Sequence, residues 1–258
     1  MFWWWNKREE KITLKFMSGI FFVSVSAGHR EGQAFEFIKL GKESVEKGLL
    51  NEAVVYLNKA LAIEQREDVL NLMGVILGLK GKYRESLKRF KSVLELRWNH
   101  QEAQYNCARA LFLTTCDSSA MSMLVELLEN NREIPKELDA HVNNLMGCIY
   151  GDDCEYEDAM ELFNTAIETD ETFVAPYVNY ANVYYELDEY DLAETYYKKA
   201  LELDEACIDA YNGLGAIAYK RKDVKKAEEY FDKAILLGKA DYLSYNKKLL
   251  VKLRKSVM

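Results

Sequence analysis

Side chains that could perform chemistry are scattered along this 258-residue chain. The three histidines, His29, His100 and His141, lie in separate segments, so a zinc site would require the fold to bring them together. The acidic run from Asp152 to Asp158 lacks the glycine and the ligand spacing of a calcium-binding loop. No nucleophile motif or glycine-rich phosphate loop occurs. We therefore predict a protein that is not an enzyme and that uses no cofactor or metal.

The five cysteines do not resemble a disulfide framework, because their number is odd and no C-x-x-C pair occurs. Cys107 and Cys148 fall on helix faces that the pattern described below places inside the protein. A buried thiol behaves as a small hydrophobic group. We therefore expect these two residues to be free thiols in the core.

The composition favours a helical globular protein that does not bind nucleic acid. Hydrophobic residues make up 49% of the chain and charged residues 29%, which is a normal balance for a chain with a buried core. Only two prolines and thirteen glycines are present, too few for the frequent tight turns of an all-β sandwich or barrel. The net charge of -8 argues against DNA or RNA as a ligand, since phosphate contacts need clustered Lys and Arg.

Charge is distributed unevenly along the chain. Residues 150–210 contain eighteen Asp and Glu but two Lys, whereas residues 220–258 contain twelve Lys and Arg and five acids. Solvated helix faces commonly carry such charge. The alternative interpretation is that the acidic middle of the chain attracts a partner of basic character.

A pattern of small and large residues recurs along the chain. In its clearest copy, Ala181 lies between tyrosines in one segment, and Ala193 and Ala200 flank Tyr197 in the next. The small-residue anchor recurs at intervals of 33, 34, 39, 34 and 34 residues, at Gly41, Gly74, Ala108, Gly147, Ala181 and Gly215. Two helices can cross closely only where small side chains meet, and large residues such as Phe163 and Phe231 then fill the space around the crossing.

The period and the pattern resemble the tetratricopeptide repeat (TPR) family over residues 34–241. The resemblance implies an all-α, right-handed solenoid of six helix–turn–helix repeats, at residues 34–66, 67–100, 101–139, 140–173, 174–207 and 208–241. The third repeat departs most from the pattern and carries a five-residue excess. Its linker at residues 130–135 ends in Pro135, which cannot continue a helix, so we expect a hinge there. Residues 242–258 form an amphipathic stretch that we expect to be a C-terminal capping helix.

The resemblance also implies that the first helix of each repeat lines a concave groove in which a partner lies. The residues expected to face this groove form an Asn- and Tyr-rich surface of Asn71, Tyr105, Arg109, Phe112, Asn144, Asn179, Asn182, Tyr185, Asn212 and Tyr219. Asparagine offers donors and an acceptor, so a row of asparagines could hold an extended peptide through its backbone. The alternative is that these asparagines are typical of the family for structural reasons, since two of them flank Ala181.

One ligand class that the family is known for is disfavoured. Some TPR co-chaperones bind a C-terminal carboxylate through paired Lys, Asn and Arg residues. In this sequence Val178 stands one turn before Asn182 where that arrangement has Lys, and Asp209 and Gly213 stand where it has cations. We therefore do not expect a receptor for chaperone tails.

Residues 1–33 support three interpretations. A basic segment precedes an apolar run from Phe16 to Ala27 that ends in small residues, as in a secretory signal peptide, but Glu9 and Glu10 are atypical of one. The same run could be a helix that caps the first repeat. A membrane anchor is the third interpretation, although a bilayer-spanning helix needs about 20 apolar residues and this run is shorter.

Taken together, these observations predict a non-catalytic scaffold or adaptor that binds a peptide segment or a protein partner in the groove. A cytoplasmic location is favoured. The alternatives are an exported or envelope-associated assembly factor, which differs mainly in the fate of residues 1–27, and a self-assembling scaffold. In the self-assembling scaffold, the groove of one copy would receive the N-terminal tryptophan segment, residues 1–6, of another copy.

Overall fold

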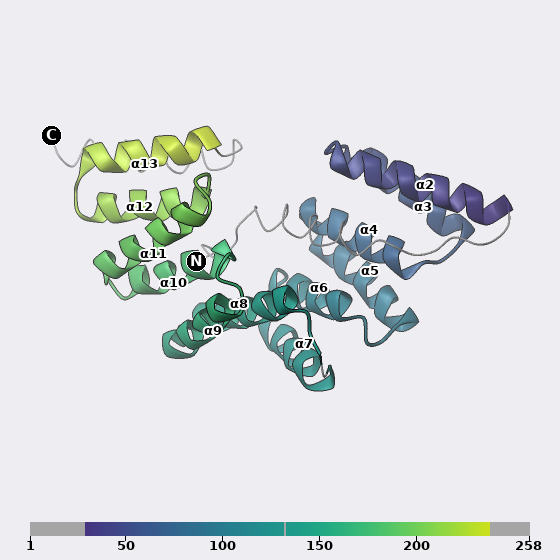
Figure 1. Cartoon of the computed structure of the whole chain (residues 1–258), viewed down its shortest axis with the longest axis horizontal. Helices are drawn as coiled ribbons and strands as arrows, with labels where there is room; N and C mark the ends of the chain where they lie inside the picture. Colours follow the sequence, from purple (N-terminus) through teal and green to yellow (C-terminus); the bar gives the residue numbers. More distant parts are fainter. Residues whose placement is uncertain (1–28, 132, 238–258) are drawn as a thin grey trace. The chain divides into compact units, whose positions relative to one another are not determined.

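The computed structural model describes residues 29–131 and 133–237, and these residues form twelve α-helices and no strand (Figure 1). The predicted all-α fold is confirmed. The tryptophan segment, the apolar run at residues 16–27 and the expected C-terminal cap at residues 242–258 lie outside the described residues. None of the helices in the described ranges has the length and apolar character needed to cross a bilayer.

The helices belong to two compact units that meet in the sequence between Ile134 and Pro135. This boundary lies inside the linker where the sequence predicts a hinge, and the hinge itself stays a prediction. Pro135 is the N-cap residue of the next helix, which begins at Lys136, about one turn before the predicted start of the fourth repeat.

The first unit contains three helical hairpins, drawn in purple to teal in Figure 1. Its helices are α2 (His29–Glu46), α3 (Leu50–Ile63), α4 (Glu67–Leu79), α5 (Tyr83–Leu96), α6 (Gln101–Phe112) and α7 (Asp117–Asn130). Each odd-numbered helix packs on the helix before it, and α4 also contacts α3 and α6. These contacts are those of consecutive stacked hairpins.

The second unit contains three further hairpins. Its helices are α8 (Lys136–Asp152), α9 (Tyr156–Thr169), α10 (Val174–Glu186), α11 (Tyr190–Leu203), α12 (Ile208–Lys220) and α13 (Val224–Leu237). The first helices of these hairpins are neighbours, because α10 contacts both α8 and α12. The six hairpins of the two units are those that the 34-residue period predicts.

Each hairpin turns at one residue in the left-handed backbone region. This residue follows the end of the first helix by two or three positions, at Gly48, Gly81, Thr115, Cys154, Asp188 and Lys222, with φ between 59° and 73°. Glycine adopts this conformation at no steric cost, whereas other residues pay about 1–2 kcal/mol. Four of the six turns therefore keep the same geometry without the residue that favours it, which shows how strongly the packing of the two helices dictates the turn.

The anchor glycines let the two helices of a hairpin approach each other closely. A Cβ atom placed on Gly74 would lie 2.4 Å from Cε1 of Phe90, and one on Gly147 would lie 2.6 Å from Cε1 of Phe163. The anchors Gly41 and Gly215 face Leu57 and Phe231 in the same way, at 2.7 and 2.6 Å. No side chain fits at these distances, so the large residue of the second helix occupies the place that a side chain on the first helix would need.

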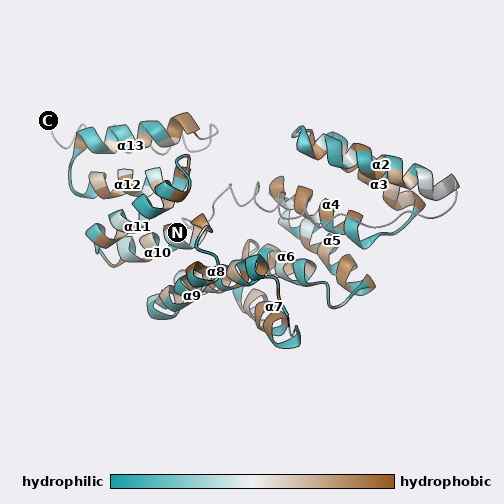
Figure 2. Cartoon of the chain, in the orientation of Figure 1, coloured by the Kyte–Doolittle hydropathy of each residue, from teal (hydrophilic) through white to brown (hydrophobic). Residues whose placement is uncertain are grey.

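The first helices are buried on more sides than the second helices. Every residue from Val69 to Leu77 of α4 is buried, whereas α5 buries only Ser86, Phe90 and Val93. Hydrophobic and hydrophilic residues accordingly alternate along the second helices, as α5 and α13 illustrate in Figure 2. A helix that packs on several neighbours can bury polar residues as well as apolar ones, provided that they find hydrogen-bond partners.

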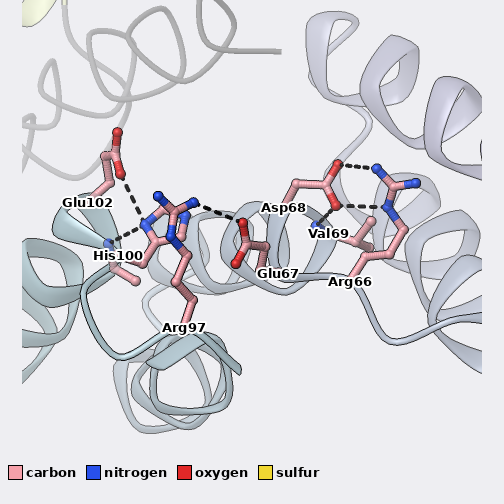
Figure 3. Close-up of polar contacts among 8 residues, drawn as sticks. Arg66, Glu67, Asp68, Val69, Arg97, His100 and Glu102 are labelled. Atoms are coloured by element: carbon pink, nitrogen blue, oxygen red, sulfur yellow. Dashed lines mark hydrogen bonds and ion pairs between the residues drawn. The ribbon is translucent and has the colours of Figure 1, made fainter. Parts of the chain in front are cut away.

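Polar contacts lie at the ends of neighbouring helices of the first unit (Figure 3). Arg97, at the end of α5, donates to a carboxylate oxygen of Glu67 in the first turn of α4 at 3.2 Å. His100 is the N-cap of α6: its Nδ1 lies 3.3 Å from the backbone nitrogen of Ala103 and 3.0 Å from Oε2 of Glu102. The hydrogen bond with His100 lowers the pKa of Glu102. These contacts stabilise the turn between the second and third hairpins.

Two glycines one turn apart on α4 test the packing of the anchors. Gly74→Ala is expected to lower the free energy of unfolding by about 1–3 kcal/mol, because the new Cβ collides with the Phe90 ring. Gly78→Ala is the matched control, since its Cβ would meet only Oγ of Ser86 at 3.5 Å. Alanine is the better helix former by about 0.8–1.0 kcal/mol, so the control should be as stable as the parent or more stable. Equal urea unfolding midpoints for the two variants would contradict the assigned packing.

Candidate functional site

The ten predicted groove residues all lie on first helices of hairpins. Asn71 is on α4; Tyr105, Arg109 and Phe112 are on α6; and the other six are on α8, α10 and α12, namely Asn144, Asn179, Asn182, Tyr185, Asn212 and Tyr219. The first four belong to the first unit and the other six to the second. Each group is described within its own unit.

Half of these residues have almost no exposed surface. The five buried side chains, which expose 3–7% of their surface, are Asn71, Tyr105, Asn144, Asn179 and Asn212. The Nδ2 of Asn179 donates to Oδ1 of Asn144 at 2.9 Å and lies 3.2 Å from Sγ of Cys148, so these asparagines connect α10 with α8. This arrangement supports a structural role for the buried asparagines.

The half-buried residues of the second unit are the ones that a ligand could reach. Asn182, Tyr185 and Tyr219 are partly exposed on α10 and α12, and Arg109 and Phe112 have the same degree of exposure in the first unit. Asn182 and Tyr185 lie in the wall of a cavity of about 280 Å³, which we call the α10 cavity. Its walls come from three consecutive hairpins and consist of Gly151, Asp152, Cys154, Tyr156, Asn182, Tyr185, Glu186, Tyr197, Gly213 and Ala216.

Most of the residues that line the α10 cavity are not among the predicted groove residues. Glu186 lies one turn after Asn182 on α10, so helical spacing alone places the two on one face. Tyr197 lies on a second helix, and the repeat pattern assigns it to packing between helices. Its side chain is 2% exposed, and its hydroxyl donates to Oδ1 of Asn182 at 2.5 Å. Tyr197 therefore both packs in the core and positions a polar group of the cavity wall.

The fifth hairpin packs differently from its neighbours, and this difference shapes the α10 cavity. Its anchor is Ala181 where the flanking hairpins have Gly147 and Gly215, and its large residue is Tyr197 where they have phenylalanine. A Cβ atom on Gly213, in the next hairpin, would lie 2.1 Å from Cζ of Tyr197. The tyrosine ring thus occupies the space left by a glycine of the following repeat.

The charged side chains that line the α10 cavity are acidic. Asp152 and Glu186 line it, and none of the ten lining residues is Lys, Arg or His. Burial, followed by nearby acidic groups, raises the pKa of Tyr197 well above its usual value. A hydrogen bond with Cys154 is the main cause of a raised pKa at Tyr156, to which the charge of Glu186 also contributes. Tyr156 and Tyr197 are therefore neutral at physiological pH.

A lysine already interacts with the tyrosines beside the α10 cavity. The rings of Tyr185 and Tyr190 lie 5.6 Å apart, and the Nζ of Lys220 is 5.6 Å from the first centroid and 5.9 Å from the second. A hydrogen bond with Tyr190 is the main cause of the raised pKa of Lys220. Tyrosine faces attract cations through the ring quadrupole. This part of the surface therefore suits positive charge.

Three other tyrosines of the fifth hairpin pack between its two helices. The Tyr180 and Tyr196 rings stack at 4.6 Å between α10 and α11, and Tyr184 lies 5.4 and 5.6 Å from them. Burial raises the pKa of Tyr180 to about 12. This cluster occupies the face of α10 that packs on α11.

The chemistry of catalytic or metal sites is not visible in the described ranges. Within residues 29–131 and 133–237, no three His, Cys, Asp or Glu side chains lie close enough together to hold a metal ion. All five cysteines are free thiols, and Cys107 and Cys148 are buried. Burial raises the pKa of Cys107 to about 12, which keeps it protonated and unreactive.

Stacked helical hairpins, in which a small residue of the first helix packs against a large residue of the second, define a class of helical-repeat proteins. Residues 173–237 match the family model of the tetratricopeptide repeat. The other hairpins of the described residues have the same helix–turn–helix arrangement. No curated protein sequence matches the chain.

Solved structures show the same fold. A tetratricopeptide repeat protein from Parabacteroides merdae superposes with a TM-score of 0.74 at 18% identity, covering 96% of this chain and 90% of that one. MamA (41-end) from Desulfovibrio magneticus gives 0.56 at 23% identity, covering 70% of this chain and 98% of that one. PilW, a type IV pilus biogenesis factor, gives 0.67 at 15% identity, covering 80% and 93%. At these identities the likeness concerns the fold alone.

The structural role of the buried asparagines can be tested with two alanine substitutions. Asn179→Ala is expected to lower the free energy of unfolding by about 1–3 kcal/mol, since it leaves Oδ1 of Asn144 buried without its donor. Asn164→Ala is the control, because Asn164 is exposed on α9 and bonds only to Glu168 in its own helix. The control should stay within about 0.5 kcal/mol of the parent in chemical denaturation. If Asn179→Ala is equally harmless, the contact between α8 and α10 is not structural.

Proposed function

We propose that this protein is a non-catalytic scaffold that binds an extended segment of a partner protein along the first helices α8, α10 and α12. The observation that carries the proposal is the α10 cavity, which is lined by residues of all three helices and is bordered by Asn182 and Tyr185. Tyrosine supplies rigid apolar area with a polar tip, and asparagine supplies a donor and an acceptor, so both suit a protein interface.

The proposal narrows the set of predicted groove residues. Asn182, Tyr185 and Tyr219 keep exposed surface on adjacent helices, whereas Asn144, Asn179 and Asn212 are buried. Asn144 and Asn179 also bond to each other between α8 and α10. We therefore assign partner contact in this unit to the partly exposed three. Arg109 and Phe112 are candidates for contact on the first unit.

The acidic charge of the second unit supports a partner of basic character. Residues 150–210 are rich in Asp and Glu, and the α10 cavity in this part of the chain is lined by Asp152 and Glu186. Fields of this kind increase the association rate of a positively charged partner and disfavour polyanions such as nucleic acid. The partner class that fits is thus a protein or peptide with Lys or Arg residues.

A triple variant tests whether this face binds partners. Asn182→Ala, Tyr185→Ala and Tyr219→Ala together should remove most partner protein retained from an extract of the native host, as measured by quantitative mass spectrometry. The matched control changes the same residue types on second helices, with Asn164→Ala, Tyr56→Ala and Tyr83→Ala on α9, α3 and α5. Both variants are first checked for helical content by circular dichroism.

The control should retain the same partners as the parent. Retention of those partners at parental levels by the first variant would show that the first-helix face is not the binding site. Loss in both variants with unchanged helical content would assign binding to surfaces beyond this face, and would equally contradict the proposal.

The location of the protein depends on residues 1–27. The cytoplasmic location favoured by the sequence predicts that the native protein keeps this segment, whereas the exported alternative predicts its removal after Ala27. N-terminal sequencing of protein isolated from the native host distinguishes the two. A mature chain that starts at Gly28 would contradict the cytoplasmic location.

A further inference from the structure

We infer that the hydroxyl group of Tyr197 is a positioning group, which turns the side-chain amide of Asn182 so that its Nδ2 donates to a backbone carbonyl of the partner segment. This inference rests on the proposed function and deepens it, because it names the ligand group that the wall of the α10 cavity recognises and the residue that sets this preference. Tyr197 acts through Asn182, since its own side chain is only 2% exposed.

Tyr197 and Asn182 represent two residue types that occur together in one hairpin only. The large residue of the second helix is tyrosine in the fifth hairpin and leucine or phenylalanine in the other five. The residue after the small anchor is asparagine in the fifth hairpin, whereas the other hairpins have Lys42, Val75, Arg109, Cys148 and Ala216. The one hairpin with an amide at this position is therefore also the one that supplies a hydroxyl group to it. Phenylalanine fills the same space in the neighbouring hairpins, so packing alone does not require the hydroxyl.

The hydrogen bond between the two side chains fixes which end of the amide faces the core. The hydroxyl of Tyr197 donates to Oδ1 of Asn182 at 2.5 Å. The ring is held in place by close packing, since a Cβ atom on Gly213 would lie 2.1 Å from its Cζ. Burial raises the pKa of Tyr197 well above its usual value, so the hydroxyl keeps its proton and remains a donor. A reversed amide would present Nδ2 to this proton and remove the acceptor that it has in the described ranges.

With Oδ1 held on the core side, Nδ2 of Asn182 is the atom offered to a ligand. Asn182 is half-buried and lines the α10 cavity. Within residues 29–131 and 133–237, no group accepts a hydrogen bond from its Nδ2. An amide nitrogen carries two hydrogens and no acceptor, so the ligand atom that meets it has to be an acceptor. An asparagine whose orientation is already fixed also loses less side-chain entropy on binding than a freely rotating one.

The charge in the cavity wall favours a neutral acceptor over a carboxylate. Glu186 lines the cavity and lies one turn after Asn182 on α10. Its charge contributes to the raised pKa values of both Tyr156 and Tyr197, so its field reaches two tyrosines of the wall. Glu186 repels a ligand carboxylate more strongly than a neutral carbonyl group. Each residue of an extended segment carries a backbone carbonyl, which makes this group the acceptor that the proposed partner presents.

Binding measurements with a selected peptide test the inference. The probe is a peptide from a random library displayed on phage, selected on the immobilised parent protein and required to bind more weakly to the variant Asn182→Ala. Tyr197→Phe is expected to weaken the binding of this peptide about fivefold or more, because the amide loses its fixed orientation. The variant keeps the ring, and phenylalanine occupies this position in the neighbouring hairpins, so its helical content by circular dichroism should equal that of the parent.

Tyr196→Phe is the matched control. It removes the same hydroxyl group from the preceding residue, whose ring packs between α10 and α11 and does not line the cavity. The control should bind the peptide within about twofold of the parent. A double variant separates positioning from a general effect on the fold, because Tyr197→Phe should weaken binding by less than about twofold when Asn182 is already alanine. Equal weakening in both backgrounds would show that Tyr197 does not act through Asn182.

Two further measurements identify the donor and the acceptor without the Tyr197 variant. Asn182→Asp keeps an oxygen for the hydroxyl of Tyr197 but replaces the Nδ2 donor with an acceptor, so it should weaken binding at least as strongly as Asn182→Ala. Backbone amides of the peptide are also replaced by esters one at a time, which makes each carbonyl a poorer acceptor. One replacement should weaken binding to the parent about fivefold or more and have little effect on binding to Asn182→Ala.

The outcomes separate the inference from the proposed function. The inference is overturned if Tyr197→Phe binds the peptide like the parent, if Asn182→Asp binds it as tightly as the parent or more tightly, or if no ester replacement depends on Asn182. In each of these cases the peptide still depends on Asn182, so the proposed function stands. If every selected peptide binds the variant Asn182→Ala with Tyr185→Ala as tightly as the parent, both are wrong.

Discussion

The contact between a small residue on one helix and a large residue on the next is the constraint on which the whole structure depends. Gly41, Gly74, Gly147 and Gly215 lie so close to Leu57, Phe90, Phe163 and Phe231 that no Cβ atom fits between them. This approach sets the distance between the two helices of a hairpin, and the same geometry holds four hairpin turns in a left-handed conformation without glycine. Because one hairpin cannot cover its own apolar face, stacking of such units produces the fold.

The fifth hairpin shows how this constraint can yield a site. Ala181 replaces the anchor glycine there, Tyr197 replaces phenylalanine, and Gly213 of the next hairpin makes room for the tyrosine ring. The exchange preserves close packing and adds a hydroxyl group that holds Asn182. A departure from the repeat thus positions the residues of the α10 cavity, and departures from a local pattern are where function is expected.

The polar and charged residues near the α10 cavity differ in what they contribute to the stability of the helices. Asp152 and Glu186 stand at helix ends where acids are unfavourable for the helices themselves. Asn144 and Asn179, in contrast, satisfy each other inside the protein and stabilise the stack. Stability and binding are therefore assigned to different polar residues of the same helices, and exposure decides between the two roles.

The sequence by itself determined the helical class through its low content of proline and glycine. Its 34-residue period, through the resemblance to the tetratricopeptide repeat, predicted the six hairpins and their packing residues. It also placed all ten predicted groove residues on first helices. Only the tertiary structure decided which of them remain accessible, since the burial of Asn179 depends on Asn144, 35 residues earlier in another hairpin. The α10 cavity likewise arises where Tyr197 meets Gly213, and a contact between repeats has no signature within either repeat.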